Sequence, residues 1–390
     1  MIVVGMLSGT SMDGLDVAVA DLEIADGVIE LTPVATSTTA WSPHVHKRLL
    51  ALLPPSNTTI DEVCELDTLV GQAAADAAAA ALAQAGVSGD LICWLGQTAY
   101  HWVRDGRALG SLQLGQPAWI AERTGLPVVS DLRTTDIAAG GHGAPLASTL
   151  DALWLAGPDR RAALNIGGIA NITVVGPGER VVAYDTGPGN CLIDVVATRA
   201  GCPGYDVDGA LAAWGHVDEA LLAELLADPY YRAEPPKSTG RELFTADYLT
   251  KMLAVQPRAL PPSDVAATLV ALTARTVALA CTGHGVTEVI GSGGGMRNPV
   301  LVAALRDALH PIPLRSSDEL GLPTDAKEAY LTALLGFLTW NGLPGVTQGA
   351  TGSTTPRILG RITPGQTPLR LPEPATAATT LRVRKTDRSR

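Results

Sequence analysis

Positive charge is scarce in this sequence of 390 residues, and so are aromatic side chains. The formal net charge is -11, and only 4% of the residues are Phe, Trp or Tyr. Proteins that bind nucleic acids usually carry a basic patch, often with aromatic side chains on which bases stack. The balance of charge therefore argues against a nucleic-acid partner.

The sequence also lacks a cysteine pattern. Its five cysteines show no CxxC spacing, and they stand at Cys64, Cys93, Cys191, Cys202 and Cys281. A structural zinc site needs closer pairs of ligands, and an odd count does not suit a disulfide framework. Free thiols in a reducing cytosol are the interpretation that these positions favour.

No stretch of the sequence is typical of a signal peptide or a membrane span. Asp13 and Asp16 interrupt the first apolar region, which has no basic segment before it. The most apolar helical candidate, ATLVALTARTVALAC at 267–281, contains three threonines and Arg275. This pattern predicts a core helix, so we expect a cytoplasmic protein without a membrane partner.

Several common enzyme motifs are missing. The sequence contains no G-x-x-x-x-G-K-[ST], no G-x-G-x-x-G, no HExxH and no G-x-S-x-G. The standard phosphate loop, the dinucleotide fingerprint and the commonest hydrolase signatures are thereby excluded.

What is present is an α/β alternation with 46% hydrophobic residues. Residues 2–7 and 15–23 are predicted strands joined by a turn, and 62–86 is a predicted helix ending at Gly86. A second strand, glycine turn and strand follow at 161–176. The length and this recurrence predict two domains with related halves.

The first turn, LSGTSMDGLD, has the chemistry for a magnesium nucleotide. Gly9 and Gly14 let the backbone approach a ligand closely, and the hydroxyls of Thr10 and Ser11 can donate to phosphate oxygens. Carboxylates in the turn can hold hydrated Mg²⁺. An ordinary hairpin turn, rich in Gly, Ser and Asp for local reasons, is the alternative.

Three further positions are candidates. The cluster GSGGGMRN at 291–298 lies between a predicted strand and a predicted helix, which suits an anion site. Asp185 ends a strand before a Gly-Pro-Gly turn, where it could serve as general base or cap its own turn. Glu328 begins a helix and could simply favour the helix dipole.

Several longer segments together resemble the anhydro-N-acetylmuramic acid kinase family. They include GMLSGTSMDGLDVAVADL, LNIGGIANIT, YDTGPGNCLID, PPKSTGRELF, GSGGGMRNPVL and DAKEAYLTALLG. The resemblance implies a two-domain, duplicated ribonuclease-H-like (actin-like ATPase) fold with an interdomain nucleotide cleft. Its expected domains are 1–135 with a return at about 350–372, then 136–349, then a solvated polar tail at 373–390.

The resemblance also implies roles for individual residues. Asp185 would be the catalytic base, Arg133 and Glu328 would hold the sugar, and Asp13 would hold Mg²⁺ through water. The residues implied to contact ATP are Gly9, Thr10, Ser11, Met12, Asp13, Gly14, Leu15, Asp16, Gly167, Gly168, Gly293, Gly294 and Gly295. A homodimer is expected by analogy with the family only.

The reaction that the resemblance implies couples opening of a 1,6-anhydro sugar by water to phosphorylation of O6 by ATP. Leu95 and His142 depart from the family pattern, which leaves selectivity for the sugar open. A kinase for a related anhydro sugar, a chaperone-like ATPase and a sugar sensor without turnover remain the alternatives.

Overall fold

The chain folds into two compact units. The computed structural model describes residues 1–9, 12, 14–53, 56–235, 237–239, 243–347 and 350–384. Unit 1 comprises Met1–Ala156, Leu320–Leu322 and Ala326–Arg390, and unit 2 comprises Gly157–Glu319 and Pro323–Asp325.

Unit 1 combines a mixed sheet with helices. Its strands are β1 (Ile2–Ser8), β2 (Gly14–Ala25), β3 (Val28–Ala40), β4 (Leu91–Arg104), β5 (Arg107–Leu114), β6 (Val128–Ser130), β12 (Arg361–Thr363) and β13 (Thr380–Val383). Its helices are α1 (Pro43–Ala51), α2 (Ile60–Ala85), α3 (Pro117–Thr124), α4 (Thr134–Ala138), α5 (Ala147–Trp154) and α12 (Lys327–Trp340).

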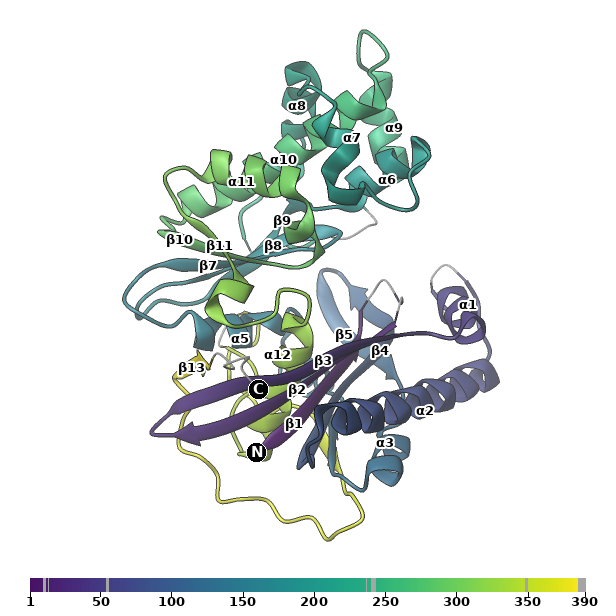
Figure 1. The fold of residues 1–390 in the computed structure, drawn as a ribbon, viewed down its shortest axis with the longest axis vertical. Coiled ribbons are helices and arrows are strands. Elements are labelled where there is room, and N and C mark those ends of the chain that lie inside the picture. Colours follow the sequence, from purple (N-terminus) through teal and green to yellow (C-terminus); the bar gives the residue numbers. More distant parts are fainter. Residues whose placement is uncertain are drawn as a thin grey trace. The chain divides into compact units, whose positions relative to one another are not determined.

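Unit 2 combines a smaller, five-stranded sheet with helices (Figure 1). Its strands are β7 (Arg161–Ile166), β8 (Ile169–Val175), β9 (Val182–Pro188), β10 (Glu288–Ser292) and β11 (Leu314–Ser316). Its α-helices are α6 (Cys191–Arg199), α7 (Ala210–Ala213), α8 (Glu219–Leu226), α9 (Ala246–Ala254), α10 (Pro262–Gly283) and α11 (Pro299–Leu309). Short 3-10 turns are η1 (Val207–Gly209), η2 (Pro229–Arg232), η3 (Gly294–Arg297) and η4 (Ser317–Leu320), the last of which ends in unit 1.

The two sheets share one strand pattern. In unit 1 the order β3-β2-β1-β4-β6 has antiparallel pairs β3–β2 and β2–β1, followed by parallel pairs β1–β4 and β4–β6. In unit 2 the order β9-β8-β7-β10-β11 repeats this sequence of directions. A three-strand meander continued by two parallel strands is the ribonuclease-H-like pattern, and it occurs twice. The expected duplicated α/β fold is confirmed.

Helices cover both faces of the sheet of unit 1. Val4 and Met6 belong to the same buried cluster as the apolar side of α2. Gly5, which points the other way, lies against α12: a Cβ on Gly5 would stand 2.1 Å from the Ala329 carbonyl oxygen. Because side chains alternate along a strand, α2 and α12 occupy opposite faces. The glycine is what lets α12 approach β1 so closely.

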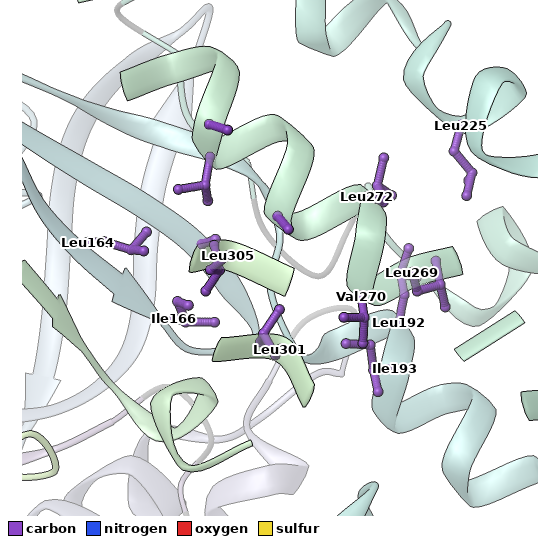
Figure 2. Packing of buried hydrophobic residues seen from close by; sticks show 14 of the residues in the cluster. Leu164, Ile166, Leu192, Ile193, Leu225, Leu269, Val270, Leu272, Leu301 and Leu305 are labelled. Carbon is purple, nitrogen blue, oxygen red and sulfur yellow. The ribbon is translucent and has the colours of Figure 1, made fainter. Parts of the chain in front are cut away.

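The core of unit 2 lies between its sheet and helices α10 and α11. Figure 2 shows Leu164 and Ile166 of β7 beside Leu301 and Leu305 of α11, all fully buried. Helix α10 is long and apolar enough to cross a membrane, but 72% of its apolar window is buried inside the protein. It therefore matches the core helix predicted for 267–281.

The division into units differs from the expected domain boundaries. Unit 1 continues past residue 135 to Ala156 and takes back the chain from Ala326 onward, because α12 packs on β1, β2 and β4. The polar tail also differs from the expected loose end. Residues Thr380–Val383 form β13, which pairs in parallel with β3, and Arg384 Nε lies 3.0 Å from Glu30 Oε2. The tail thus covers an edge strand that would otherwise be open.

Candidate active site

In unit 2, the second glycine turn and the turn after Asp185 are joined by backbone hydrogen bonds. Strands β7 and β9 are both antiparallel to β8, so their carboxyl ends meet at one edge of the sheet. There the amide of Asn190 donates to the Gly167 carbonyl at 2.9 Å, and the amide of Gly189 donates to the Gly168 carbonyl at 2.9 Å. A Cβ on Gly189 would lie 2.5 Å from the Gly167 oxygen, so this contact needs a glycine.

The third glycine cluster lies beside the same turn. A Cβ on Gly293 would lie 2.6 Å from the Asn165 Oδ1 atom, and one on Gly295 would lie 2.3 Å from Ile166 Cγ2. Among the described residues other than the chain neighbours, no atom lies within 4 Å of a Cβ position on Gly294, and only one, at 3.8 Å, lies that close on Gly167. Packing thus explains the glycines at 293 and 295. The open space above Gly167 and Gly294 fits close approach of a ligand to the backbone.

The sequence suggested that residues 291–298 aim the amino terminus of a helix at an anion. The amino terminus of α11 is not available for that contact. The turn η3 separates it from the glycines, and its residue Pro299 has no N–H to donate. The side chain of Asn298 accepts hydrogen bonds from the amides of Val300 and Leu301, at 3.0 Å and 3.1 Å. The first donors of α11 are therefore already satisfied within the protein.

Asp185 is the middle residue of β9 and is half-buried. The sequence predicted that it ends the strand, but β9 continues for three residues to Pro188. Asp185 pairs with Asn171 of β8, three residues after the turn at Gly168. Its Oδ2 atom accepts a hydrogen bond from the amide of Thr239 at 2.8 Å, and its carbonyl accepts one from the Tyr230 hydroxyl at 2.7 Å. The carboxylate is thus held at the same edge of the sheet as the two glycine turns of unit 2.

In unit 1, the first turn follows β1, and Gln97 supports it through hydrogen bonds. The Ser8 hydroxyl donates to Gln97 Oε1 at 2.6 Å, and Gln97 Nε2 lies 3.4 Å from the Gly9 carbonyl oxygen. Met12 is buried with a left-handed φ of 56°, and its amide donates to the Gly9 carbonyl at 3.1 Å. Thr10, Ser11 and Asp13, which carry the expected donors and the metal ligand, lie outside the described residues.

Gly14, Leu15 and Asp16 begin β2 at this turn. A Cβ on Gly14 would lie 2.5 Å from the Thr39 carbonyl of β3, so packing within the sheet accounts for this glycine. Leu15 is buried in the core. Asp16 accepts a hydrogen bond from the Thr38 hydroxyl at 2.7 Å. Of these three residues, only Asp16 presents a polar side chain.

Asp16, Arg133 and Glu328 interact electrostatically in unit 1. The pKa of Glu328 is raised, chiefly because the surrounding protein displaces water from the carboxylate and then because Asp16 repels its charge. Loss of water also lowers the pKa of Arg133, while Glu328 opposes that shift. Glu328 nevertheless keeps an exposed side chain, so it lies among protein atoms with a route to solvent. The two residues implied to hold the sugar are therefore brought together.

Arg133 is anchored to a glycine-rich loop. Its Nη1 atom donates to the Gly143 carbonyl at 2.7 Å, whereas its buried Nε atom has no hydrogen-bond partner in the described part of the chain. The fully buried Asp136 holds the same loop, accepting from the Gly143 amide at 2.7 Å and from the Thr351 hydroxyl at 2.8 Å. An unpartnered guanidinium nitrogen is a donor suited to an anionic group.

The two departures from the family pattern occupy different surroundings. Charge from Arg133 and His142 adds to burial in lowering the pKa of His101, so His142 belongs to the neighbourhood of Arg133. Leu95 instead lines a cavity of about 150 Å³ in unit 1, with Gln113 and Ser130 also in its wall.

No group of three or more His, Cys, Asp or Glu side chains suited to a metal ion occurs among the residues that the structure describes. Mg²⁺ keeps most of its waters and needs only one or two carboxylates. Asp16 is a described carboxylate in the first turn, while Asp13 is not described.

Comparison with known sequences decides the family. The sequence profile of anhydro-N-acetylmuramic acid kinase matches residues 1–365. The protein of that name from Streptomyces coelicolor is 52% identical over 379 residues, covering 96% of this chain and 97% of the relative. Its counterpart from Rhodococcus erythropolis is 48% identical, covering 98% of this chain and 99% of the relative. The chain belongs to the anhydro-N-acetylmuramic acid kinase family.

This family assignment confirms that the chain is a kinase, as the motifs indicated. Solved structures show more distant similarity. The activator of 2-hydroxyisocaproyl-CoA dehydratase from Clostridium difficile is 14% identical with a TM-score of 0.42, covering 86% of this chain and 94% of that chain. A ROK family glucokinase from Streptomyces griseus is 16% identical with a TM-score of 0.35, covering 86% and 99%.

The sequence did not reveal several residues that support the first turn, the loop that holds Arg133, and Asp185. Gln97 and Asp136 are fully buried polar residues, and Tyr230 contacts the main chain of Asp185. Patterns in the sequence assigned a role to none of these three residues. The contacts of Asp136 with residue 351 span 215 positions, so no local pattern predicts them.

Proposed function

We propose that this kinase opens the 1,6-anhydro bond of anhydro-N-acetylmuramic acid with water and transfers the γ-phosphoryl group of ATP to O6. The products are N-acetylmuramic acid 6-phosphate, ADP and a proton. The observation that carries this proposal is the position of Asp185, fixed at the same edge of the sheet as the glycine turns of unit 2. Membership of the family supplies the substrate class.

In this proposal Asp185 removes a proton from water as the water oxygen attacks C1. The bond between C1 and the bridging oxygen breaks, and that oxygen, still bonded to C6, attacks the γ-phosphorus. Because phosphorus accepts the leaving oxygen, no second carboxylate has to protonate it, unlike in most glycoside hydrolases. Asp185 then releases its proton to solvent.

The glycine-bearing turns are proposed to bind the triphosphate through backbone N–H groups. Gly167, Gly168 and Gly293–Gly295 serve from unit 2, and residues 9–16 serve from unit 1. The open space above Gly167 and Gly294 supports this assignment. Bound Mg²⁺, with Asp13 as its proposed partner through water, would neutralise phosphate charge.

Arg133 and Glu328 are proposed to hold the sugar. The unpartnered Nε atom of Arg133 suits the carboxylate of the lactyl group, which simple anhydro sugars lack. Glu328 can accept hydrogen bonds from sugar hydroxyls. We further propose a cytoplasmic location and a homodimer.

A coupled ADP-release assay tests the function. We expect ADP release with 1,6-anhydro-N-acetylmuramic acid, and little with levoglucosan or N-acetylglucosamine. In ¹⁸O-labelled water the label should enter at C1 of the phosphorylated sugar. Label found only in inorganic phosphate would mean ATP hydrolysis without sugar opening. Binding of the sugar without any ADP release would indicate a sensor instead.

A further inference from the structure

The segment Lys237–Thr239 binds Asp185 from two sides. The amide of Asp185 donates to the Lys237 carbonyl at 3.3 Å, and the amide of Thr239 donates to the Asp185 carboxylate at 2.8 Å. One short segment therefore contacts both the main chain and the side chain of Asp185.

The side chain of Lys237 turns back onto the protein. Its Nζ atom donates to the Tyr230 carbonyl at 3.0 Å. The same atom lies 4.8 Å from the centre of the Tyr230 ring and 5.7 Å from that of Tyr184, the residue before Asp185. Contacts of an ammonium group with aromatic rings and a carbonyl fix the lysine, and with it the segment.

Tyr230 links Lys237 to the strand that carries Asp185. Its hydroxyl donates to the Asp185 carbonyl at 2.7 Å, so one tyrosine binds both the lysine and the strand that carries Asp185. The ring is held edge-on by Phe244 at 5.7 Å and by Tyr231 at 5.8 Å. We refer to Lys237 and Tyr230 together as the clamp. The aromatic contacts hold the tyrosine of the clamp rigidly within unit 2.

We propose that Lys237 and Tyr230 are positioning residues that hold the Thr239 amide against the Asp185 carboxylate. This inference rests on the proposed role of Asp185 as general base. A hydrogen bond to the ionised carboxylate keeps it charged and oriented toward water. Loss of either residue loosens the segment, which weakens that hydrogen bond and disturbs the orientation.

The test compares Lys237→Met and Tyr230→Phe with the wild type. The control is Lys251→Met, which changes an exposed lysine in the last turn of α9 in the same unit. We expect kcat to fall about tenfold or more in Lys237→Met, because small misplacements of a reacting group are costly. Tyr230→Phe should show a smaller loss, while KM for ATP stays constant in both. The control should match the wild type.

The pH profile separates positioning from general structure. Weaker hydrogen bonding raises the pKa of a carboxylate, so the acid limb of the kcat profile should move to higher pH in both variants. An unchanged kcat and acid limb would overturn the proposal. A raised KM for ATP with unchanged kcat would also overturn it, since Lys237 would then bind phosphate.

Asp185→Asn, measured in parallel, separates this inference from the proposed function. If Asp185→Asn retains wild-type turnover, the base assignment itself fails. If Asp185→Asn is inactive while both clamp variants behave as the wild type, only the clamp is wrong. Thermal unfolding and ATP binding check that each variant is folded. If Lys237→Met does not fold, Tyr230→Phe tests the positioning role by the same two measurements, kcat and the acid limb of its pH profile.

Discussion

Lys327 and Asp151 form a buried ion pair in unit 1, with Nζ 2.6 Å from Oδ1 and side chains only 9% and 4% exposed. The ammonium group also lies 5.8 Å from the centre of the Trp154 ring. The pair joins the first residue of α12 to α5. Since Glu328 is the next residue, the pair fixes the end of the helix that carries it.

Removing one partner of this pair should destabilise the protein. We expect Lys327→Met to lower the free energy of unfolding by about 3–5 kcal/mol, because Asp151 is left buried without its counterion. The double variant Lys327→Met, Asp151→Leu should recover much of that loss. Denaturant titration of the wild type, Lys327→Met, Asp151→Leu and the double variant measures the coupling. A double variant destabilised by the sum of the two single variants would show that the charges are independent.

The close contact of α12 with β1 predicts the effect of a single added methyl group. Gly5→Ala would place a Cβ 2.1 Å from the Ala329 oxygen and 2.3 Å from the Ala333 nitrogen, so α12 must move. We expect a loss of about 1–3 kcal/mol or more, with weaker sugar binding because Glu328 moves too. Gly283→Ala is the control: no atom lies within 4 Å of its Cβ position, and it should be neutral or slightly stabilising. Thermal unfolding of both variants measures the difference.

Much of the fold follows from local patterns in the sequence. The helix expected at 62–86 is α2, which ends at Gly86 with a left-handed φ of 66°. The first predicted hairpin is β1 and β2, whose pairing sets Leu7 opposite Asp16. Apolar runs and glycine stops report such elements because hydrogen bonding and burial act over a few residues.

The division of the chain into two units could not be predicted from local sequence patterns. Helix α12 follows most of unit 2 in the sequence but packs on unit 1, and β13 pairs with β3 from 352 positions away. Such long-range pairing depends on which surfaces remain open after the rest has folded. The candidate site shows the same limit. Asp185 was found from its strand and turn, whereas its contacts with Tyr230 and Thr239 span 45 and 54 positions.

Asp136 should prove important for the loop that holds Arg133. Asp136→Ala leaves the Gly143 amide and the Thr351 hydroxyl without their acceptor, which we expect to cost about 1–3 kcal/mol for each group that stays buried. The Gly143 carbonyl would then hold Arg133 less firmly, so KM for the sugar should rise more than KM for ATP. Thr351→Val, which removes only one of the two bonds, is the matched control and should show the smaller effect in both measurements.

Asp185→Asn should abolish most turnover without unfolding the protein. The amide can still accept a hydrogen bond from the Thr239 amide, but it cannot take a proton from water. We expect kcat to fall by a factor of about 10²–10⁴, while ADP binding measured by calorimetry stays near the wild-type value. Thr186→Val, at the next position of β9, removes a hydroxyl that bonds the Ala170 carbonyl and serves as a structural control. Wild-type turnover in Asp185→Asn would exclude the residue as base.

Glu328→Gln should stabilise the protein while it weakens the sugar reaction. Because the pKa of Glu328 is raised above its ordinary 4.5 by loss of water and by Asp16, ionisation of this group disfavours the folded state. Relative to the unfolded chain, the penalty is absent below about pH 4 and appears as the pH rises through the raised pKa. The variant should therefore unfold at a higher temperature than the wild type at pH 7, and at the same temperature near pH 4.

Glu319→Gln is the control for Glu328→Gln, and its sign is opposite. The pKa of Glu319 is lowered, first by the hydrogen bond from the Ser316 amide and then by Arg315. Its ionisation stabilises the fold, so Glu319→Gln should lower the unfolding temperature at pH 7 and lose that effect as the pH falls through the lowered pKa. A Glu328→Gln variant less stable than the wild type at pH 7 would mean that attraction from Lys327 and Arg133 outweighs the partial loss of water and the repulsion by Asp16. In that case Glu328 would be a structural ion-pair partner, and the sugar would need another acceptor.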